Sequence, residues 1–306
     1  MQTGSGVDVK PFGVIDNRVT LLIIAADYLV IFATIVIAVR VDHPVATLIA
    51  MVLIAGRQVA FLNLVHAASH YSLMSKRKMN DRVDLLVAYL ILDGVRPYRG
   101  NHLPHHHLFN RKDPGRFEYL EDRITGHEAG FWRRTWEVFL KPFLGGDGIG
   151  FVRSTFDQAM DNRWWTLRLA IYWLVVVSLC AWAGWLKYLL LYWIVPLLWI
   201  YPVFYNWAEL SDHFAVREDA RNQQGLFYSL FIKGHEMYHA VHHLYPRIPF
   251  YRIKAASKHL QASGAQFEET RGFLDFLKIL YRRTLPPSAA EQPSAPLGQP
   301  DSALAG

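Results

Sequence analysis

The chain has 306 residues, of which 52% are hydrophobic and 14% aromatic, and its formal net charge is +6. This composition is too apolar for an ordinary soluble domain and too charged for a bundle made only of spanning helices. It therefore indicates a membrane core that carries a sizeable polar part. The single cysteine, Cys180, excludes an intramolecular disulfide framework and a cysteine-based zinc site.

Four apolar runs are each about twenty residues long, which is enough for a helix to cross ~30 Å of hydrocarbon. In chain order they cover residues 19–39, 44–64, 165–186 and 188–207. The turns inside the first pair and inside the second pair are very short, so the runs predict two tight helical hairpins. Asp27, Arg57 and Gln58 fall within the first two runs, where polar groups are costly, and we expect them to pair with one another or to line a cavity.

Basic residues are concentrated outside these hairpins. Between Tyr71 and Arg163 there are 15 Lys and Arg residues, and 11 follow from Asn206 onward, whereas each hairpin turn holds one. The positive-inside rule then places both polar segments and both termini in the cytoplasm, beside a bacterial inner membrane or an endoplasmic reticulum. Because membrane topology already explains the distribution of Lys and Arg, the net positive charge does not indicate binding to nucleic acid.

These features together predict an all-α integral membrane protein. Two hairpins form a four-helix stem, and residues 65–164 and 208–285 form a helical cytoplasmic cap above it. Residues 1–285 would make one domain, and residues 286–306, rich in Pro, Ser, Ala and Gly, would form a disordered tail.

Histidines gather in three tight groups beside the apolar runs. The groups are His66 and His70; His102, His105 and His106; and His239, His242 and His243. Imidazole is the commonest side-chain metal ligand, and spacings of three and four residues place side chains on one face of a helix. A helix that starts at Pro44 carries His66 about 33 Å along its axis, and one that starts at Tyr188 carries His213 about 37 Å along. Both hairpins thus deliver histidines to the same membrane edge, which predicts a metal centre of more than one ion.

Some residues near these groups remain open to two interpretations. His107 allows a competing spacing with His102 and His106, and His235 lies one turn before His239, so each is a weaker ligand candidate with a supporting role as the alternative. Asn110 and Asp113 follow the second group and could hydrogen-bond the ring nitrogens and orient them. The remaining histidines, His43, His127 and His259, are interpreted as surface or structural residues.

The chain resembles the membrane-bound fatty acid desaturase superfamily, which includes acyl desaturases, lipid hydroxylases and carotenoid oxygenases. The resemblance runs from about residue 56 to residue 260 and depends on the segments LNLVHAASHYSL, YRGNHLPHHHLFNRKDP, ELSDHF and YHAVHHLYPRIPFYRI, in this order. It implies a mushroom-like stem under a cytoplasmic cap that houses two irons. The implied ligands are the eight histidines of the three groups, and His213 matches an additional histidine after the fourth span. Glu209 stands where some members have an Asn near a metal-bound water, which makes its carboxylate a further candidate.

The sequence departs from that family pattern at two other places. Ala67 stands where an acidic residue commonly follows the first histidine, and Met237 replaces an Asn often seen before the third group. These changes leave the expectation of iron binding intact and bear on the outcome of the reaction.

Clustered neutral imidazoles suit iron, and a centre of two irons could use O2 and two electrons to remove hydrogen from an unactivated C–H bond. We therefore predict an O2-dependent acyl desaturase whose substrate is an apolar acyl or lipid chain. A hydroxylase or another oxygenase on the same scaffold is the alternative. Electrons are expected from a separate ferredoxin or cytochrome b5-type donor, which the basic cytoplasmic face would attract. A metal transporter fits less well, because transporters bind their substrates near the bilayer midplane, and a purely structural metalloprotein is the remaining alternative.

Overall fold

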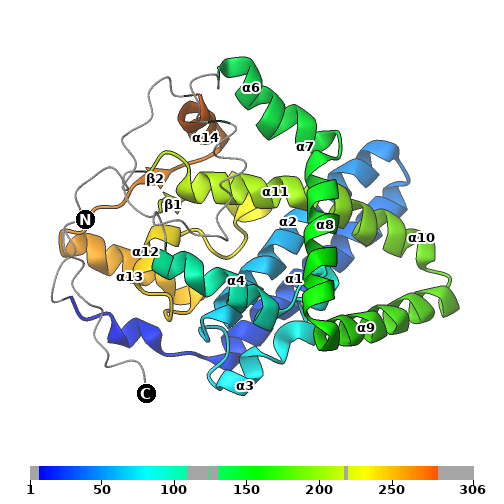
Figure 1. Ribbon diagram of the computed structural model, residues 1–306, viewed down its shortest axis with the longest axis horizontal. Coiled ribbons are helices and arrows are strands. Elements are labelled where there is room, and N and C mark those ends of the chain that lie inside the picture. The colour runs from blue at the N-terminus through cyan, green and yellow to red at the C-terminus, as the bar shows by residue number, and fades with distance from the viewer. Residues whose placement is uncertain (1–6, 109–123, 125–129, 217–219, 282–306) are drawn as a thin grey trace.

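The computed structural model describes residues 7–108, 124, 130–216 and 220–281 (Figure 1). The described chain is mostly helical, and its two short strands, β1 (Asn222–Gln223) and β2 (Glu269–Thr270), pair in parallel. The predicted all-α class is therefore confirmed. The tail at 286–306 lies outside the described residues, so the prediction of its disorder stays a prediction.

Four helices are long and apolar enough to cross a membrane, and they form the two expected hairpins. The first hairpin consists of α1 (Asn17–Val41) and α2 (Pro44–Ser69). The second consists of α9 (Arg163–Trp182) and a 28-residue helix, Leu186–His213. The latter is made of α10 (Leu186–Leu189), a π-helical turn η5 (Leu190–Ile194) and α11 (Val195–His213).

Local sequence explains where these helices turn. Asp42 ends α1 in the left-handed conformation, with φ of 47°, and Pro44 begins α2, where its missing N–H does no harm. The side chain of His43 accepts a hydrogen bond from the backbone N–H of Val45 and caps α2, which is a structural role. In the second hairpin, α9 ends at Trp182 rather than at 186 as predicted, because the chain turns at Gly184, with φ of 69°.

The inner and outer helices of the stem differ in burial. α2 and α11 pack against each other and are about half buried, whereas α1 and α9 present most of their apolar side chains outward. Phe32 of α1 and Trp182 of α9, for example, are 65% and 88% exposed. Such outward apolar surfaces fit a helical stem in lipid. The two inner helices both continue past the predicted ends of their spans, α2 as far as Ser69 and α11 as far as His213.

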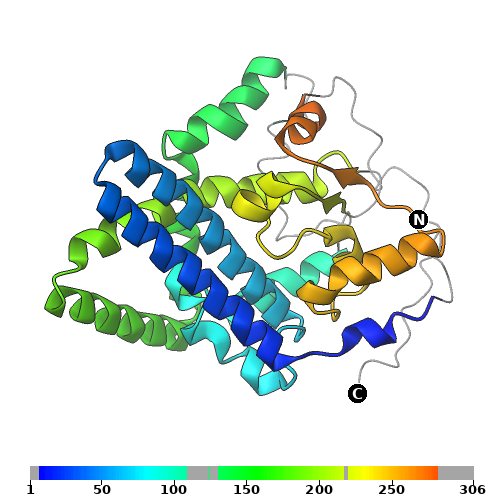
Figure 2. The same cartoon turned by 180° about the vertical axis from the view of Figure 1, so that it is seen from behind.

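Shorter helices surround the ends of the inner pair (Figures 1 and 2). Between the hairpins lie α3 (Arg77–Asn80), η2 (Val83–Leu85), η3 (Tyr89–Ile91), α4 (Val95–Leu108), α6 (Phe131–Thr135), the π-helical η4 (Trp136–Leu140), α7 (Lys141–Phe143) and α8 (Gly146–Asp161). After the second hairpin come the π-helical η6 (Tyr228–Ile232), α12 (His239–Leu244), α13 (Phe250–Ala262) and α14 (Phe273–Leu280). The N-terminal turn η1 (Lys10–Gly13) packs on α13.

Two of the three polar residues inside the first hairpin, Asp27 and Arg57, belong to one largely buried cluster. Arg57 Nη1 lies 3.1 Å from Asp27 Oδ1, which confirms the predicted pairing of these residues. The other oxygen of Asp27 lies 2.6 Å from His235 Nε2, and Arg57 Nη2 donates a 2.8 Å hydrogen bond to the carbonyl of Ser229. The cluster therefore ties α1 and α2 to the segment that contains η6. Gln58 instead donates to the carbonyl of Trp193, in the π-helical turn of the second hairpin.

Candidate metal centre

Five histidines from three helices form a first cluster. They are His66 and His70 from α2 and its end, His102 and His106 from α4, and His242 from α12. Their ligand nitrogens all lie within 4.8 Å of one another. The Nε2 atom of His102 is 3.0 Å from that of His70 and 2.9 Å from that of His106. Bonds of about 2.1 Å from one metal ion to imidazoles at right angles would separate the nitrogens by about 3.0 Å, so this spacing fits a single ion.

Three further histidines form a second cluster beside the first. His213 ends α11, and His239 and His243 lie one turn apart on α12. The Nε2 atom of His239 is 3.1 Å from that of His213 and 3.1 Å from that of His243. The rings of His66 and His239, one from each cluster, have centroids 5.9 Å apart. The two clusters are therefore neighbours, each with the spacing of an ion site.

The third histidine group is divided between the two clusters, which the sequence interpretation of one common helical face did not anticipate. His239 and His243 are four residues apart and belong to the second cluster, whereas His242 belongs to the first. Successive residues on a helix differ in direction by about 100°, so His242 and His243 point to different partners. α12 thus runs between the clusters and contributes to both.

The buried ring nitrogens suit metal ions. The Nε2 atoms of His66 and His242 are buried and have no hydrogen-bond partner among the described residues. A buried nitrogen of this kind is unfavourable unless something binds it. Burial also lowers the pKa of His242 and of His239 well below the usual value, and the ammonium group of Lys233 adds to the effect at His239. Both rings are consequently neutral at physiological pH, and the neutral imidazole is the form that binds metal.

Glu236 lies between the clusters and was missed by the sequence analysis. One carboxylate oxygen hydrogen-bonds to His66 Nδ1, and the other lies 3.2 Å from His239 Nδ1 and 3.6 Å from His242 Nδ1. A carboxylate on the Nδ1 side fixes the tautomer of an imidazole and leaves its Nε2 for a metal. Glu236 therefore orients rings in both clusters at once. The available sequence signal was an acidic residue three positions before His239.

The turn that carries Glu236 is held by α2 and α11. Asn63 of α2 donates a hydrogen bond to the carbonyl of Lys233, and the ammonium group of Lys233 pairs with the carboxylate of Asp212. Burial works against the charge of Lys233, but the carboxylates of Asp212 and Glu236 raise its pKa above the usual value. Gly234 adopts φ of +50°, and an added Cβ there would lie 2.6 Å from the Cβ of Ala60. Only glycine allows this close approach without strain.

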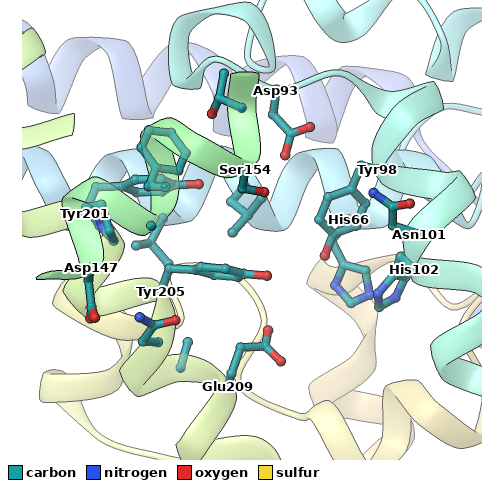
Figure 3. Close-up of a pocket in the computed structure, with 18 of the residues that line it drawn as sticks. His66, Asp93, Tyr98, Asn101, His102, Asp147, Ser154, Tyr201, Tyr205 and Glu209 are labelled. Atoms are coloured by element: carbon teal, nitrogen blue, oxygen red, sulfur yellow. The ribbon is translucent and has the colours of Figure 1, made fainter. Parts of the chain in front are cut away.

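A cavity of about 910 Å³ opens on both clusters. His66 and His102 of the first cluster and His213 and His239 of the second are among its lining residues. Figure 3 shows His66 and His102 at one side of this space, opposite Tyr201 and Tyr205 of α11. A substrate in the cavity would lie against the candidate metal ligands.

Comparison with known proteins agrees with this geometry. The chain matches the fatty acid desaturase family over residues 42–272, well over half of its length. It belongs to the fatty acid desaturase family. It is also similar to dihydrorhizobitoxine desaturase of Bradyrhizobium elkanii, with 27% identity over 270 residues that cover 79% of this chain and 75% of that protein. The family and this relative together identify a desaturase-like oxidoreductase, and the four apolar helices indicate a membrane protein.

The other ligand candidates from the sequence either belong to neither cluster or have side chains outside the residues that the structure describes. His235 bonds to Asp27 and packs on Phe250, with ring centroids 5.2 Å apart, and it belongs to neither cluster. Glu209 is one helical turn before His213 and lines the cavity, and neither cluster includes it. His105 and His107 belong to α4, but their side chains are outside the described part of the chain, as are Asn110, Asp113 and His127.

Proposed function

We propose that this member of the fatty acid desaturase family is an O2-dependent di-iron enzyme that introduces a double bond into its substrate. The observation that carries the proposal is the pair of adjacent histidine clusters that open on one cavity. The proposed ligands are His66, His70, His102, His105, His106 and His242 around one iron, and His213, His239 and His243 around the other. His105 enters this set from its sequence group alone.

The overall reaction would be R–CH2–CH2–R′ + O2 + 2 electrons + 2 H⁺ → R–CH=CH–R′ + 2 H2O. Two bound irons would supply the O2 chemistry that no amino-acid side chain provides. The protein residues would orient the ligands, chiefly through Glu236, and hold the target carbons in the cavity beside His66 and His239. The acyl or lipid identity of the substrate stays a prediction from the family resemblance.

We further propose that the metal clusters and both termini face the cytoplasm, in a bacterial inner membrane or an endoplasmic reticulum. The distribution of Lys and Arg along the sequence supports this orientation. The clusters lie at the ends of α2 and α11. The N-terminal turn η1 packs on α13, which in turn contacts α12 of the clusters. This supports a topology in which the N-terminus and the clusters are on the same side of the membrane.

A separate protein would deliver the electrons, in our proposal an acidic ferredoxin or cytochrome b5-type donor. α13 follows the third histidine group and presents Lys254 and Lys258, four residues apart and both exposed. Opposite charges at such a surface raise association rates, and salt screens the effect. Turnover with a soluble donor should therefore slow as ionic strength rises. A rate that does not change with ionic strength would remove the support for this docking mode.

The test of function is product analysis with the iron-loaded, detergent-solubilised protein, O2 and a reduced donor. Mass spectrometry should show a product lighter than its substrate by two hydrogens, formed only when iron, O2 and donor are all present. A product heavier by one oxygen would identify a hydroxylase instead. Absence of any O2-dependent product across acyl lipids and smaller alkyl substrates would reject the oxidase function.

A further inference from the structure

The stretch from α6 to α8, residues 131–161, carries apolar side chains on its outer surface. In its first half four of them recur every fourth residue and are 46% to 79% exposed: Trp132, Trp136, Leu140 and Leu144. On α8 four more recur at intervals of three or four residues and are 50% to 73% exposed: Ile149, Val152, Phe156 and Met160. We call these eight side chains the outer stripe. A helix in water would present polar side chains on such a surface, so the outer stripe needs an apolar partner.

Hydrogen bonds fasten this stretch to α11, in the fourth span. The indole N–H of Trp199 donates a 2.9 Å hydrogen bond to the carbonyl of Phe143, after which α7 ends. The indole N–H of Trp207 donates another, also of 2.9 Å, to the carbonyl of Val138 in η4. Both tryptophans fall within the apolar run 188–207. The stretch is therefore attached to the membrane-spanning part of this helix.

α8 contacts α11 far from the metal clusters. An added Cβ at Gly148 would lie 2.2 Å from the carbonyl oxygen of Leu198, so the two backbones touch there. Leu198 precedes the cluster residue His213 by fifteen positions, or about 22 Å along the helix axis. Figure 1 shows α8 crossing α11 and leading to the start of α9, the third span. The outer side of α8 thus lies at a depth where the stem helices are in lipid.

α8 is suited to lie across the membrane boundary and not to span the bilayer. Its sixteen residues extend about 24 Å, less than the ~30 Å of hydrocarbon, and it is not one of the four described helices that could span. Three exposed charged residues each follow a residue of the outer stripe by one position: Arg153, Asp157 and Asp161. One position turns a helix by about 100°, so a charged side adjoins the apolar one. Adjacent apolar and charged sides are typical of helices at the membrane interface.

We propose that residues 131–161 form a second membrane-binding element, which inserts the outer stripe into the lipid leaflet on the metal-cluster side of the stem. Lipid is the partner because the stripe continues into the outward surface of α9. Trp164 and Leu167 follow Met160 in the chain and are 65% and 49% exposed. The inference does not depend on the reaction that the protein catalyses. It moves these residues from the predicted cap at 65–164 into the membrane interface.

The corner between α7 and α8 is the part of this element that inserts deepest. Leu144 and Ile149 flank the corner and are 76% and 73% exposed. Gly145 allows the sharp turn between the helices with φ of +96°. At the other end of the stretch Trp132 would lie nearer the headgroups, a position that tryptophan favours.

The experiment measures depth with nitroxide spin labels on the full-length protein in lipid nanodiscs. Single cysteines are introduced into a background that carries Cys180→Ala. Labels at Leu144→Cys and Phe156→Cys should collide often with O2, which concentrates in lipid, and rarely with a nickel chelate, which stays in water. Asp157→Cys, one position along α8, is the matched control and should show a ratio of nickel to O2 collisions that is several-fold higher. Met160→Cys and Asp161→Cys repeat the comparison one turn later, so the test does not depend on a single pair.

Two reference labels define the scale of the measurement. Phe32→Cys, on the outward surface of α1, gives the value for lipid, and Lys254→Cys, exposed on α13, gives the value for water. If the labels at Leu144 and Phe156 match the water reference, the outer stripe faces solvent and the inference is overturned. If they collide rarely with both reagents, a protein partner or a second copy of the chain covers the stripe, and the inference is overturned as well. Because no turnover is measured, the result is separate from the test of the proposed function.

Discussion

The Oε1 atom of Glu236 lies 3.2 Å from the Nδ1 atom of His239. The other oxygen of the same carboxylate hydrogen-bonds to His66, which belongs to the neighbouring cluster. One buried side chain, 4% exposed, therefore sets the ring orientation in both candidate iron sites. Such a shared carboxylate makes the two sites interdependent, because any displacement of Glu236 changes ligands of each.

Replacing Glu236 by glutamine should weaken both iron sites while preserving the shape of the side chain. The neutral amide cannot hold several Nδ1–H groups as a carboxylate does, and losses of about 10–100-fold in metal affinity or activity are typical for such partners. Iron content per protein and the desaturation rate measure the effect. Glu269→Gln, the same change outside both clusters and the cavity, is the control. Normal iron content and rate in the Glu236 variant would show that the carboxylate does not orient the ligands.

His242→Ala should abolish desaturation and lower the iron content, because this ring supplies a buried Nε2 to the first cluster. The sequence predicts the same result for His105→Ala. His259→Ala, at an exposed position on α13, should change neither property. Metal analysis by mass spectrometry, together with the rate, checks all three variants. Full activity of the His242 variant would remove that residue from the ligand set.

Removing one partner of the buried pair between Asp27 and Arg57 should strongly destabilise the protein. The side chains are 4% and 13% exposed, so Arg57→Leu leaves Asp27 as a buried charge with only His235 beside it. Losses of about 3–5 kcal/mol are typical when a buried pair is broken in this way. The thermal midpoint in detergent measures the loss. Asp275→Asn, in an exposed pair with Lys278, should leave the midpoint nearly unchanged, and equal midpoints for both variants would contradict this prediction.

Gly234→Ala should misplace the segment that carries Glu236. The added methyl group would collide with Ala60 of α2, and alanine is disfavoured at φ of +50°. We expect reduced iron content even in the fraction of protein that folds, because His239 and His66 lose their common carboxylate. Gly13→Ala, where an added Cβ meets nothing within 4 Å, is the matched control. An iron content equal to that of the control would show that the segment tolerates the shift.

Stability should fall with rising pH because of one buried carboxyl group that belongs to neither histidine cluster. Burial raises the pKa of Asp84 from 3.8 to about 6, although the group accepts a hydrogen bond from the N–H of Val95. Because the folded-state pKa lies above the unfolded one, this stabilisation is present below about pH 4 and is lost as the pH passes 6. Asp84→Asn keeps the acceptor and cannot ionise. The variant should match the wild type near pH 4 and exceed it above pH 7, by at most about 3 kcal/mol.

Thermal midpoints of both proteins between pH 4 and pH 8 check this expectation. A difference between the Asp84→Asn variant and the wild type that stays constant over this range would show that the carboxyl group does not titrate as described.

The sequence by itself determined the stem and the histidine groups. The thickness of a bilayer sets the length of a spanning helix, and an apolar run of that length is a local property of the chain. The predicted start of the second span at Pro44 is the first residue of α2, and a continuous fourth helix does reach His213. The three groups indicated a metal centre because the affinity of imidazole for metal ions is a property of the histidine side chain itself, which can be read from the sequence.

Only the tertiary structure decided how these parts combine. The separation of His242 from its neighbour His243 depends on which side of α12 meets each cluster. The contact between His66 and Glu236 joins residues 170 positions apart in the chain, and no sequence spacing encodes it. The cavity was likewise hidden, because its lining comes from α2, α4, α8 and α11, which are far apart in the sequence. These features arise from packing between distant segments, which becomes definite only when the chain is folded.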